Sequence, residues 1–178
     1  MSDDVDELLA GCLKNDRRCQ KRLYEKFSPA LFAVCRRYAN SETDAEDILA
    51  DGFVSIFNSL PTYRGDSSLQ HWMKSVMLKT AINYFRKNKK HYSNQPFEEN
   101  FLGELVYDDT KVYTKLEAEN ILKIMEQMPE EWRVIFNLRI MEEYSFKEIA
   151  DELGKNENTV RVYFLRGKKW LTDQLKNE

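Results

Sequence analysis

Apolar residues along this chain recur at three- and four-residue steps rather than at every second position. The clearest run extends from Ser67, which we expect to cap a helix, to about Lys89. Its inward-facing positions are Leu69, Trp72, Met73, Val76, Met77 and Thr80. Steps of three and four are the period of an α-helix, and little of the chain alternates as a strand does. The pattern predicts an all-α protein.

Capping residues predict where two helices of the first half begin. Ser28 followed by Pro29 fits an N-cap with proline at the first helical position. The segment Thr43 to Glu46 fits a capping box, which predicts a helix from about residue 44 to residue 59. We therefore expect separate helices to start near residues 28 and 44.

The second half ends in a pattern typical of a helix-turn-helix. Ser145 and Glu148 form another capping box, and Gly154 is placed to close the short helix that follows. A turn of residues 155–157 then leads into a last helix, whose core positions are Val160, Phe164, Gly167 and Leu171. The second helix of such a motif can enter the major groove of DNA, which is about 12 Å wide.

Between the two halves, residues 92–114 interrupt the helical pattern with serine, asparagine, proline, glycine and a cluster of acids. We interpret this segment as an acidic linker. The sequence thus predicts two small helical domains, residues 1–91 and 115–178, of which the second is the helix-turn-helix domain.

The net charge of −3 does not by itself favour nucleic-acid binding, because domains that bind nucleic acid are commonly basic. The average conceals a segregation of charge. Residues 63–91 hold seven Lys and Arg against one Asp, and residues 155–171 hold five against one Glu. These two basic patches indicate two surfaces for nucleic acid.

The three cysteines, Cys12, Cys19 and Cys35, lack the C-x-x-C spacing of a zinc site, and only His71 and His91 could supply imidazole. We interpret them as buried or partly buried thiols, and expect neither a metal nor another cofactor.

No stretch of about 18 uncharged apolar residues exists, and the N-terminus is acidic where a signal peptide is basic. We therefore expect a cytoplasmic protein without membrane insertion.

Several stretches resemble the extracytoplasmic-function (ECF) subfamily of bacterial RNA polymerase sigma factors. Residues 145–154 with 158–171 resemble region 4 of that family. Residues 44–53 resemble its polymerase-binding helix, and residues 63–72 resemble the segment before its promoter-melting helix. The resemblance implies a protein that binds core RNA polymerase, directs it to specific promoters and assists DNA melting. It also implies an anti-sigma factor as a partner.

By that resemblance, the candidate site residues form three groups, and no residue is expected to be catalytic. The polymerase-binding group is Asp44, Asp47, Ile48, Asp51 and Phe53. The group near the −10 element is Tyr63, Arg64, Trp72, Lys79, Asn83, Arg86 and Lys87. The group near the −35 element is Asn158, Thr159, Arg161, Val162, Leu165, Arg166, Lys168 and Lys169.

The chemistry of these side chains is compatible with those roles. Tyr63, in a loop, is the expected base-facing aromatic, whereas Trp72 is expected to be a core residue. Arg161 and Arg166 are suited to bidentate contacts with guanine, each giving about 1 to 3 kcal/mol of discrimination. Lys168 and its neighbour Lys169 are suited to phosphate contacts.

Departures from the family's usual residues leave base preference open. In the turn, Lys155 stands in place of an apolar residue, and Val162 replaces a small polar one. Gly167 replaces a frequent alanine, which costs about 1 kcal/mol of helix stability unless close packing requires glycine. Lys79 stands where the family often has a polar residue that reads a flipped base.

Two other classes of protein account for less of the sequence. A helix-turn-helix repressor or response-regulator output module would bind a palindrome as a dimer, but it leaves residues 44–72 unexplained. An enzyme is disfavoured because the sequence has no Gly-rich phosphate loop, nucleophile elbow or metal-spaced His/Cys set.

Overall fold

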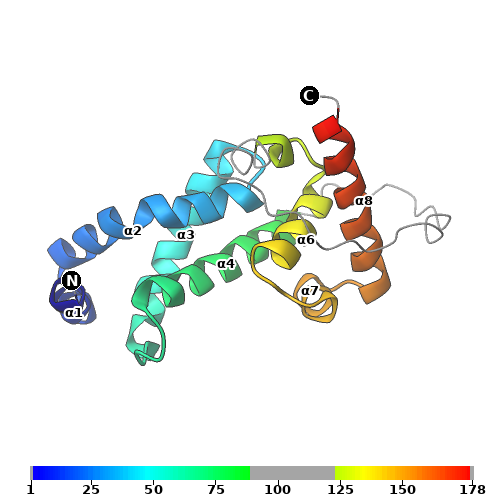
Figure 1. Ribbon diagram of the computed structural model, residues 1–178. Helices are drawn as coiled ribbons and strands as arrows, with labels where there is room; N and C mark the ends of the chain where they lie inside the picture. Colours follow the sequence, from blue (N-terminus) through cyan, green and yellow to red (C-terminus); the bar gives the residue numbers. More distant parts are fainter. Residues whose placement is uncertain (1, 89–122, 177–178) are drawn as a thin grey trace. The chain divides into compact units, whose positions relative to one another are not determined.

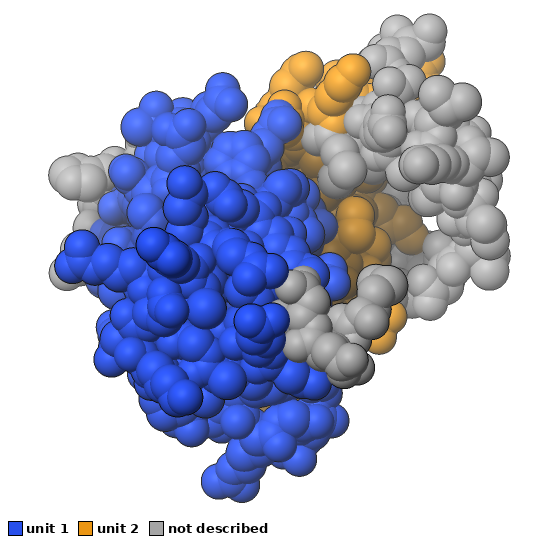
Figure 2. Space-filling view, turned by 90° about the vertical axis from the view of Figure 1, so that its left-hand side faces the viewer, with its two compact units in different colours: residues 1–88 blue, residues 89–178 orange. Residues whose placement is uncertain are grey.

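The structure, a computed structural model, describes residues 2–88 and 123–176, and every regular element in these two ranges is a helix (Figure 1). The prediction of an all-α fold is confirmed. The chain divides into two compact units, residues 1–88 and 89–178, which Figure 2 distinguishes by colour. The predicted linker, residues 92–114, lies outside the described residues.

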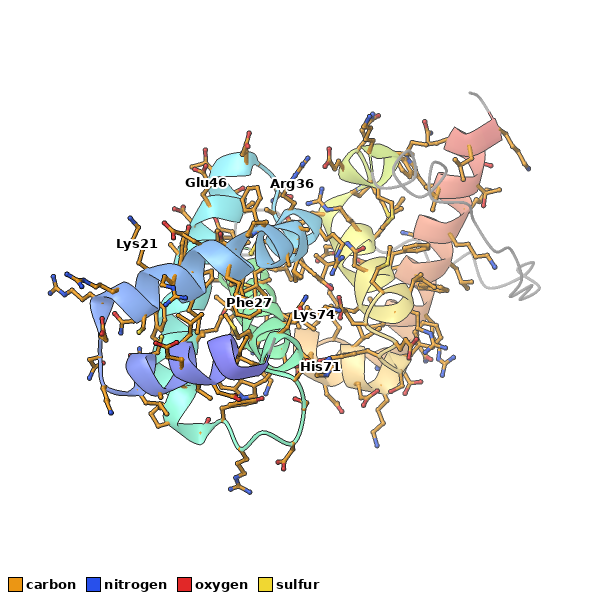
Figure 3. The ribbon with its side chains drawn as sticks, turned by 60° about the vertical axis from the view of Figure 1, so that its left-hand side comes forward. Lys21, Phe27, Arg36, Glu46, His71 and Lys74 are labelled. Carbon is orange, nitrogen blue, oxygen red and sulfur yellow. The ribbon has the colours of Figure 1, made fainter. Side chains whose placement is uncertain are left out.

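Unit 1 is built from α1 (Ser2–Leu13), α2 (Arg17–Tyr38), α3 (Glu42–Ser59) and α4 (Leu69–Asn88), with a 3-10 helix η1 (Leu60–Thr62) after α3. Helices α2, α3 and α4 pack on one another, and α1 packs on α2. Figure 3 shows Phe27 of α2 pointing into this bundle and Lys21 of the same helix pointing outward. The largest fully buried side chains of this unit include Tyr38, Phe85, Met73, Met77, Ile48, Ile56 and Ile82.

The prediction that a helix begins at Ser28 is wrong, because α2 runs without interruption through Pro29. Its N-cap is Asp16, whose Oδ1 accepts hydrogen bonds from Arg18 N (2.8 Å) and Cys19 N (3.4 Å). An interior proline costs a helix about 3 kcal/mol. One face of α2 buries apolar residues on both sides of the proline, each stabilising by about 1.5 to 3 kcal/mol: Leu23, Phe27, Leu31 and Val34. This burial outweighs the proline, whose own side chain is exposed.

The predicted caps of α3 and α4 are each displaced in the structure. Helix α3 is capped by Ser41 rather than Thr43, since Ser41 Oγ accepts from Asp44 N at 3.1 Å. In α4, Ser68 rather than Ser67 accepts, from His71 N at 3.2 Å. In both places a second hydroxyl residue lies within two positions and can serve equally as the N-cap, so the capping rule alone leaves the start of the helix open by one or two residues.

Unit 2 contains helical residues 123–126 followed by α6 (Glu130–Ile140), α7 (Phe146–Leu153) and α8 (Glu157–Lys176). Helix α8 packs on α6 and α7. The ring of Phe164 in α8 joins the three, because it stacks on Phe136 of α6 (5.5 Å between centroids) and meets Phe146 of α7 edge-on (5.4 Å). As predicted, the core positions of α8 are Val160, Phe164, Gly167 and Leu171.

The helix-turn-helix is formed by α7, a turn and α8. The predicted capping box is confirmed: Glu148 N donates to Ser145 Oγ (3.2 Å), and Ser145 N donates to Glu148 Oε2 (2.8 Å). Gly154 closes α7 with φ +61°, in the left-handed region that favours glycine. The predicted turn is one residue too long, because Glu157 already belongs to α8.

Among the described residues, no helix has the length and apolar character needed to cross a membrane.

Cys12 and Cys35 are buried and Cys19 is half-buried, as expected of thiols that act as small hydrophobic groups. Burial raises the pKa of Cys12 to about 11 and that of Cys35 to about 12, so both remain protonated at neutral pH. Within the two described ranges no group of three His, Cys, Asp or Glu side chains could hold a metal ion.

Candidate nucleic-acid and polymerase interfaces

The predicted polymerase-binding residues separate into exposed and buried positions of α3. Asp47 and Asp51 are exposed. Ile48 and Phe53 are only 0% and 3% exposed, so their assignment to a contact surface is wrong. Their side chains follow the apolar period of the helix into the core between α2, α3 and α4.

Asp44 is half-buried and has a structural partner. The hydroxyl of Tyr84 in α4 donates to Asp44 Oδ1 at 2.7 Å. This hydrogen bond, with smaller contributions from Ser41 and the backbone, lowers the pKa of Asp44, and it raises the pKa of Tyr84 to about 12. Asp44 therefore ties the first turn of α3 to the last part of α4.

An exposed apolar residue beside the acids was missed by the sequence analysis. Val54 is 59% exposed and lies three residues after Asp51, which itself follows Asp47 by four. Residues at these steps share one side of a helix. We call Asp47, Asp51 and Val54 the α3 face. Its signal in the sequence is the spacing, because Val54 stands seven residues beyond Asp47 and three beyond Asp51 and so continues their side of the helix.

The predicted −10 group lies on the loop after η1 and along α4. Tyr63 and Trp72 are both half-buried, with ring centroids 5.4 Å apart, and Tyr63 Oη donates to the carbonyl oxygen of Ser67 at 2.6 Å. The prediction that Trp72 is a core residue is wrong. The core positions on either side of it are filled by Leu69 and Met73, so the indole remains at the edge of the bundle against Tyr63.

The cationic residues of α4 form one outward surface. Lys79, Asn83, Arg86 and Lys87 are all exposed, and α4 contains no acidic residue. Arg64, in the preceding loop, is exposed as well. We call Lys79, Asn83, Arg86 and Lys87 the α4 face. Its four side chains are thus accessible on one side of α4.

The predicted −35 group lies on the side of α8 opposite its core positions. Asn158, Arg161 and Lys169 are exposed, and the half-buried members are Thr159, Val162, Leu165, Arg166 and Lys168. Arg161 has fixed neighbours: its Nε and Nη2 donate to Glu157 Oε1 at 3.1 and 2.5 Å, and its guanidinium carbon lies 4.7 Å from the centre of the Phe146 ring. We call the whole group the α8 face.

Lys155, in the turn, holds the motif together. Its Nζ lies 3.0 Å from Glu131 Oε1 of α6 and 5.0 Å from the centre of the Tyr163 ring in α8. Only 10% of its side chain is exposed. Its aliphatic stem thus occupies the place of an apolar residue while the ammonium group keeps charged and aromatic partners.

The chain has two helical units, and each presents a cationic helix face, as is typical of a DNA-binding protein. The chain matches the family model "Sigma-70 region 2" over residues 23–91 and the model "Sigma-70, region 4" over residues 118–171. The chain belongs to the sigma-70 family, and the relatives described below place it in the ECF subfamily. It is a promoter-specific transcription initiation factor, which acts with core RNA polymerase on promoter DNA.

Individual relatives agree with this assignment. The chain is 28% identical to RNA polymerase sigma factor SigV of Bacillus subtilis over 144 residues, which cover 79% of this chain and 81% of SigV. It is 22% identical to the ECF RNA polymerase sigma-E factor of Escherichia coli K12, covering 98% and 95% of the two chains. A solved structure of CnrH in complex with the cytosolic domain of CnrY has the same fold, with a TM-score of 0.50, 18% identity and coverage of 100% and 99%.

Proposed function

We propose that the three surfaces divide the work of initiation between them. The α3 face binds core polymerase, the α4 face with the Tyr63 loop holds the −10 element, and the α8 face reads the −35 element. The observation that carries this proposal is that two cationic helix faces lie on separately packed units. Two such units, joined by the segment we interpret as a linker over residues 92–114, suit two DNA elements separated along one promoter.

The α3 face suits a protein partner better than DNA. Two carboxylates beside an exposed valine repel phosphate and offer both charge and apolar area. Asp47 and Asp51 are expected to pair with basic residues of polymerase. Asp44, which accepts the Tyr84 hydrogen bond, positions this helix rather than binding the partner.

The α4 face and its preceding loop suit melted DNA. Lys79, Arg86 and Lys87 lie at helical steps along one side of α4, so they can follow the backbone of a displaced strand. The Tyr63 and Trp72 rings offer a stacking surface for an unpaired base, a contact worth about 1 to 3 kcal/mol. Capturing unpaired bases favours the melted state over duplex DNA. The protein then contributes binding energy and makes no covalent bond.

The α8 face suits duplex DNA. Arg161 and Arg166 present guanidinium groups on the side away from the core, and Lys168 and Lys169 follow them toward the C-terminus of the helix. The arginines are expected to read guanines, and the lysines to hold phosphates. With these roles the protein is expected to act in the cytoplasm, where polymerase acts. An anti-sigma factor is expected to cover the α3, α4 and α8 faces.

Run-off transcription with core polymerase and a library of genomic promoters tests the proposal. The purified chain should start transcription from a subset of promoters. Asp47→Asn with Asp51→Asn should lower the affinity for core polymerase about tenfold, whereas Asp173→Asn, an exposed acid at the far end of α8, should leave it unchanged. Failure of the unaltered chain to start transcription from any promoter would refute the proposal.

A further inference from the structure

Glu157 and Phe146, which belong to none of the three site groups, both contact Arg161. Both contacts of Glu157 come from a single oxygen: Oε1 accepts from Nε at 3.1 Å and from Nη2 at 2.5 Å. The Phe146 ring lies 4.7 Å from the guanidinium carbon. A guanidinium held along one edge and against a ring has little freedom to rotate about its long side chain.

Glu157 binds one edge of the Arg161 guanidinium and leaves the edge that contacts a base available. Arginine has five N–H groups in a rigid fork, and Glu157 uses one on Nε and one on Nη2. The fork that contacts guanine O6 and N7 is formed by Nη1 and the other N–H of Nη2. Glu157 can therefore remain bound while Arg161 reads a guanine.

Both supports are themselves anchored. Phe146 is the first residue of α7, directly after the capping box, and its ring also meets Phe164 edge-on and lies 4.9 Å from the guanidinium carbon of Arg139. Glu157 is in the first turn of α8, where a negative charge is favoured by the helix dipole. Neither support needs to move when DNA approaches the outward side of α8.

We propose that Glu157 and Phe146 are positioning residues, which hold the Arg161 guanidinium in the orientation that discriminates guanine from other bases. The proposal rests on the proposed role of the α8 face. About half of each side chain in the Arg161–Glu157 pair is exposed, and an exposed pair of this kind adds little to folding stability. Its effect therefore falls on binding, because an ordered side chain loses less freedom on contact with its base.

A promoter library with a randomised upstream element, read out with the full chain and core polymerase, tests this proposal. The measured quantity is the ratio of transcription from the preferred base pair to that from the other three at each position. Arg161→Ala should collapse the ratio at one position. Glu157→Gln should lower the same ratio about three- to tenfold, and Glu157→Ala should lower it at least as much. Asp173→Asn, which makes the same charge change in the same helix, should leave every ratio unchanged.

The outcomes separate failure of this proposal from failure of the proposed function. If Arg161→Ala leaves every ratio unchanged, the assignment of the α8 face is wrong. If Arg161→Ala collapses a ratio that both Glu157 variants preserve, Glu157 does not position the arginine, and if both variants raise that ratio, Glu157 holds the arginine away from its base. Either result overturns the proposal. A further loss in the double Glu157→Ala, Arg161→Ala variant would also overturn it, because Glu157 would then act without Arg161. Thermal unfolding of each variant verifies that the fold is retained.

Discussion

The hydrogen bond between Tyr84 and Asp44 predicts a stability change that depends on pH. Tyr84→Phe removes the hydroxyl that donates to Asp44 Oδ1 at 2.7 Å and leaves the ring in place. A hydrogen bond to a charged group contributes about 1.5 to 3 kcal/mol. Because both residues are only half-buried, we expect a loss of about 1 to 2 kcal/mol from unit 1 at pH 7.

The pH dependence follows from the direction of the two pKa shifts. The folded state lowers the pKa of Asp44, mainly through Tyr84, so this stabilisation is present above the unfolded pKa of about 3.9 and is lost as pH falls through the folded value. The pKa of Tyr84 is raised to about 12, so its contribution is present below about pH 10 and is lost as pH rises through 12. The difference between the original chain and Tyr84→Phe should therefore shrink at both extremes.

Hydrogen exchange of peptides from α3 and α4 measures the free energy of opening in unit 1 without contributions from unit 2. Tyr24→Phe is the matched control, because Tyr24 is 41% exposed, and it should change this free energy by less than about 0.5 kcal/mol. The hydrogen bond would not stabilise unit 1 as described if Tyr84→Phe lowered the free energy of opening no more than Tyr24→Phe does. The same conclusion would follow if the loss in free energy did not decline toward low pH.

Three further predictions concern unit 2. Gly167→Ala should raise the stability of unit 2 by about 0.5 to 1 kcal/mol in thermal unfolding, because an added methyl would meet Met128 Sδ and Trp132 Cβ, both at 3.4 Å, which are ordinary contacts. A loss of stability would show that the helices need glycine there. Lys155→Met should lower the free energy of unfolding of unit 2 by about 1 to 2 kcal/mol, because it removes the ammonium group that pairs with Glu131. Adding Glu131→Gln should recover most of this loss, and no recovery would contradict the pairing. Lys168→Ala should weaken binding to all promoters alike, and it should reduce the slope of log affinity against log salt concentration by about 1. A change confined to one promoter sequence would argue against a phosphate contact.

The helix-turn-helix could be predicted closely because its signals are local. The capping box of Ser145 and Glu148 and the left-handed Gly154 each act within a few residues, and the core spacing of α8 follows from helical period alone. In unit 1 the corresponding signals were ambiguous. Neighbouring serines and threonines satisfied the same capping rule, and Pro29, a local helix breaker, was overridden by apolar burial along α2.

The errors within the site have a related cause. Ile48 and Phe53 fell within the motif of the polymerase-binding helix, yet a motif records residues that hold a helix in place together with residues that contact a partner. The apolar period of α3 distinguishes these two kinds of position, and the packing of α3 against α2 and α4 shows that Ile48 and Phe53 belong to the first kind. The contacts of Asp44 with Tyr84 and of Arg161 with Phe146 could not be predicted either, because they depend on side-chain directions from residues that lie 40 and 15 positions away in sequence.

Site-specific photo-crosslinking on one promoter tests whether the α4 face and the α8 face bind different promoter elements. A photoreactive residue is placed at exposed Asn83 of α4 in one variant and at exposed Asn158 of α8 in another, each assembled with core polymerase. We expect crosslinks from position 83 to the downstream, melted element and from position 158 to the upstream duplex element. Crosslinks from both positions to a single element, or from neither to DNA, would show that the two faces do not bind separate promoter elements.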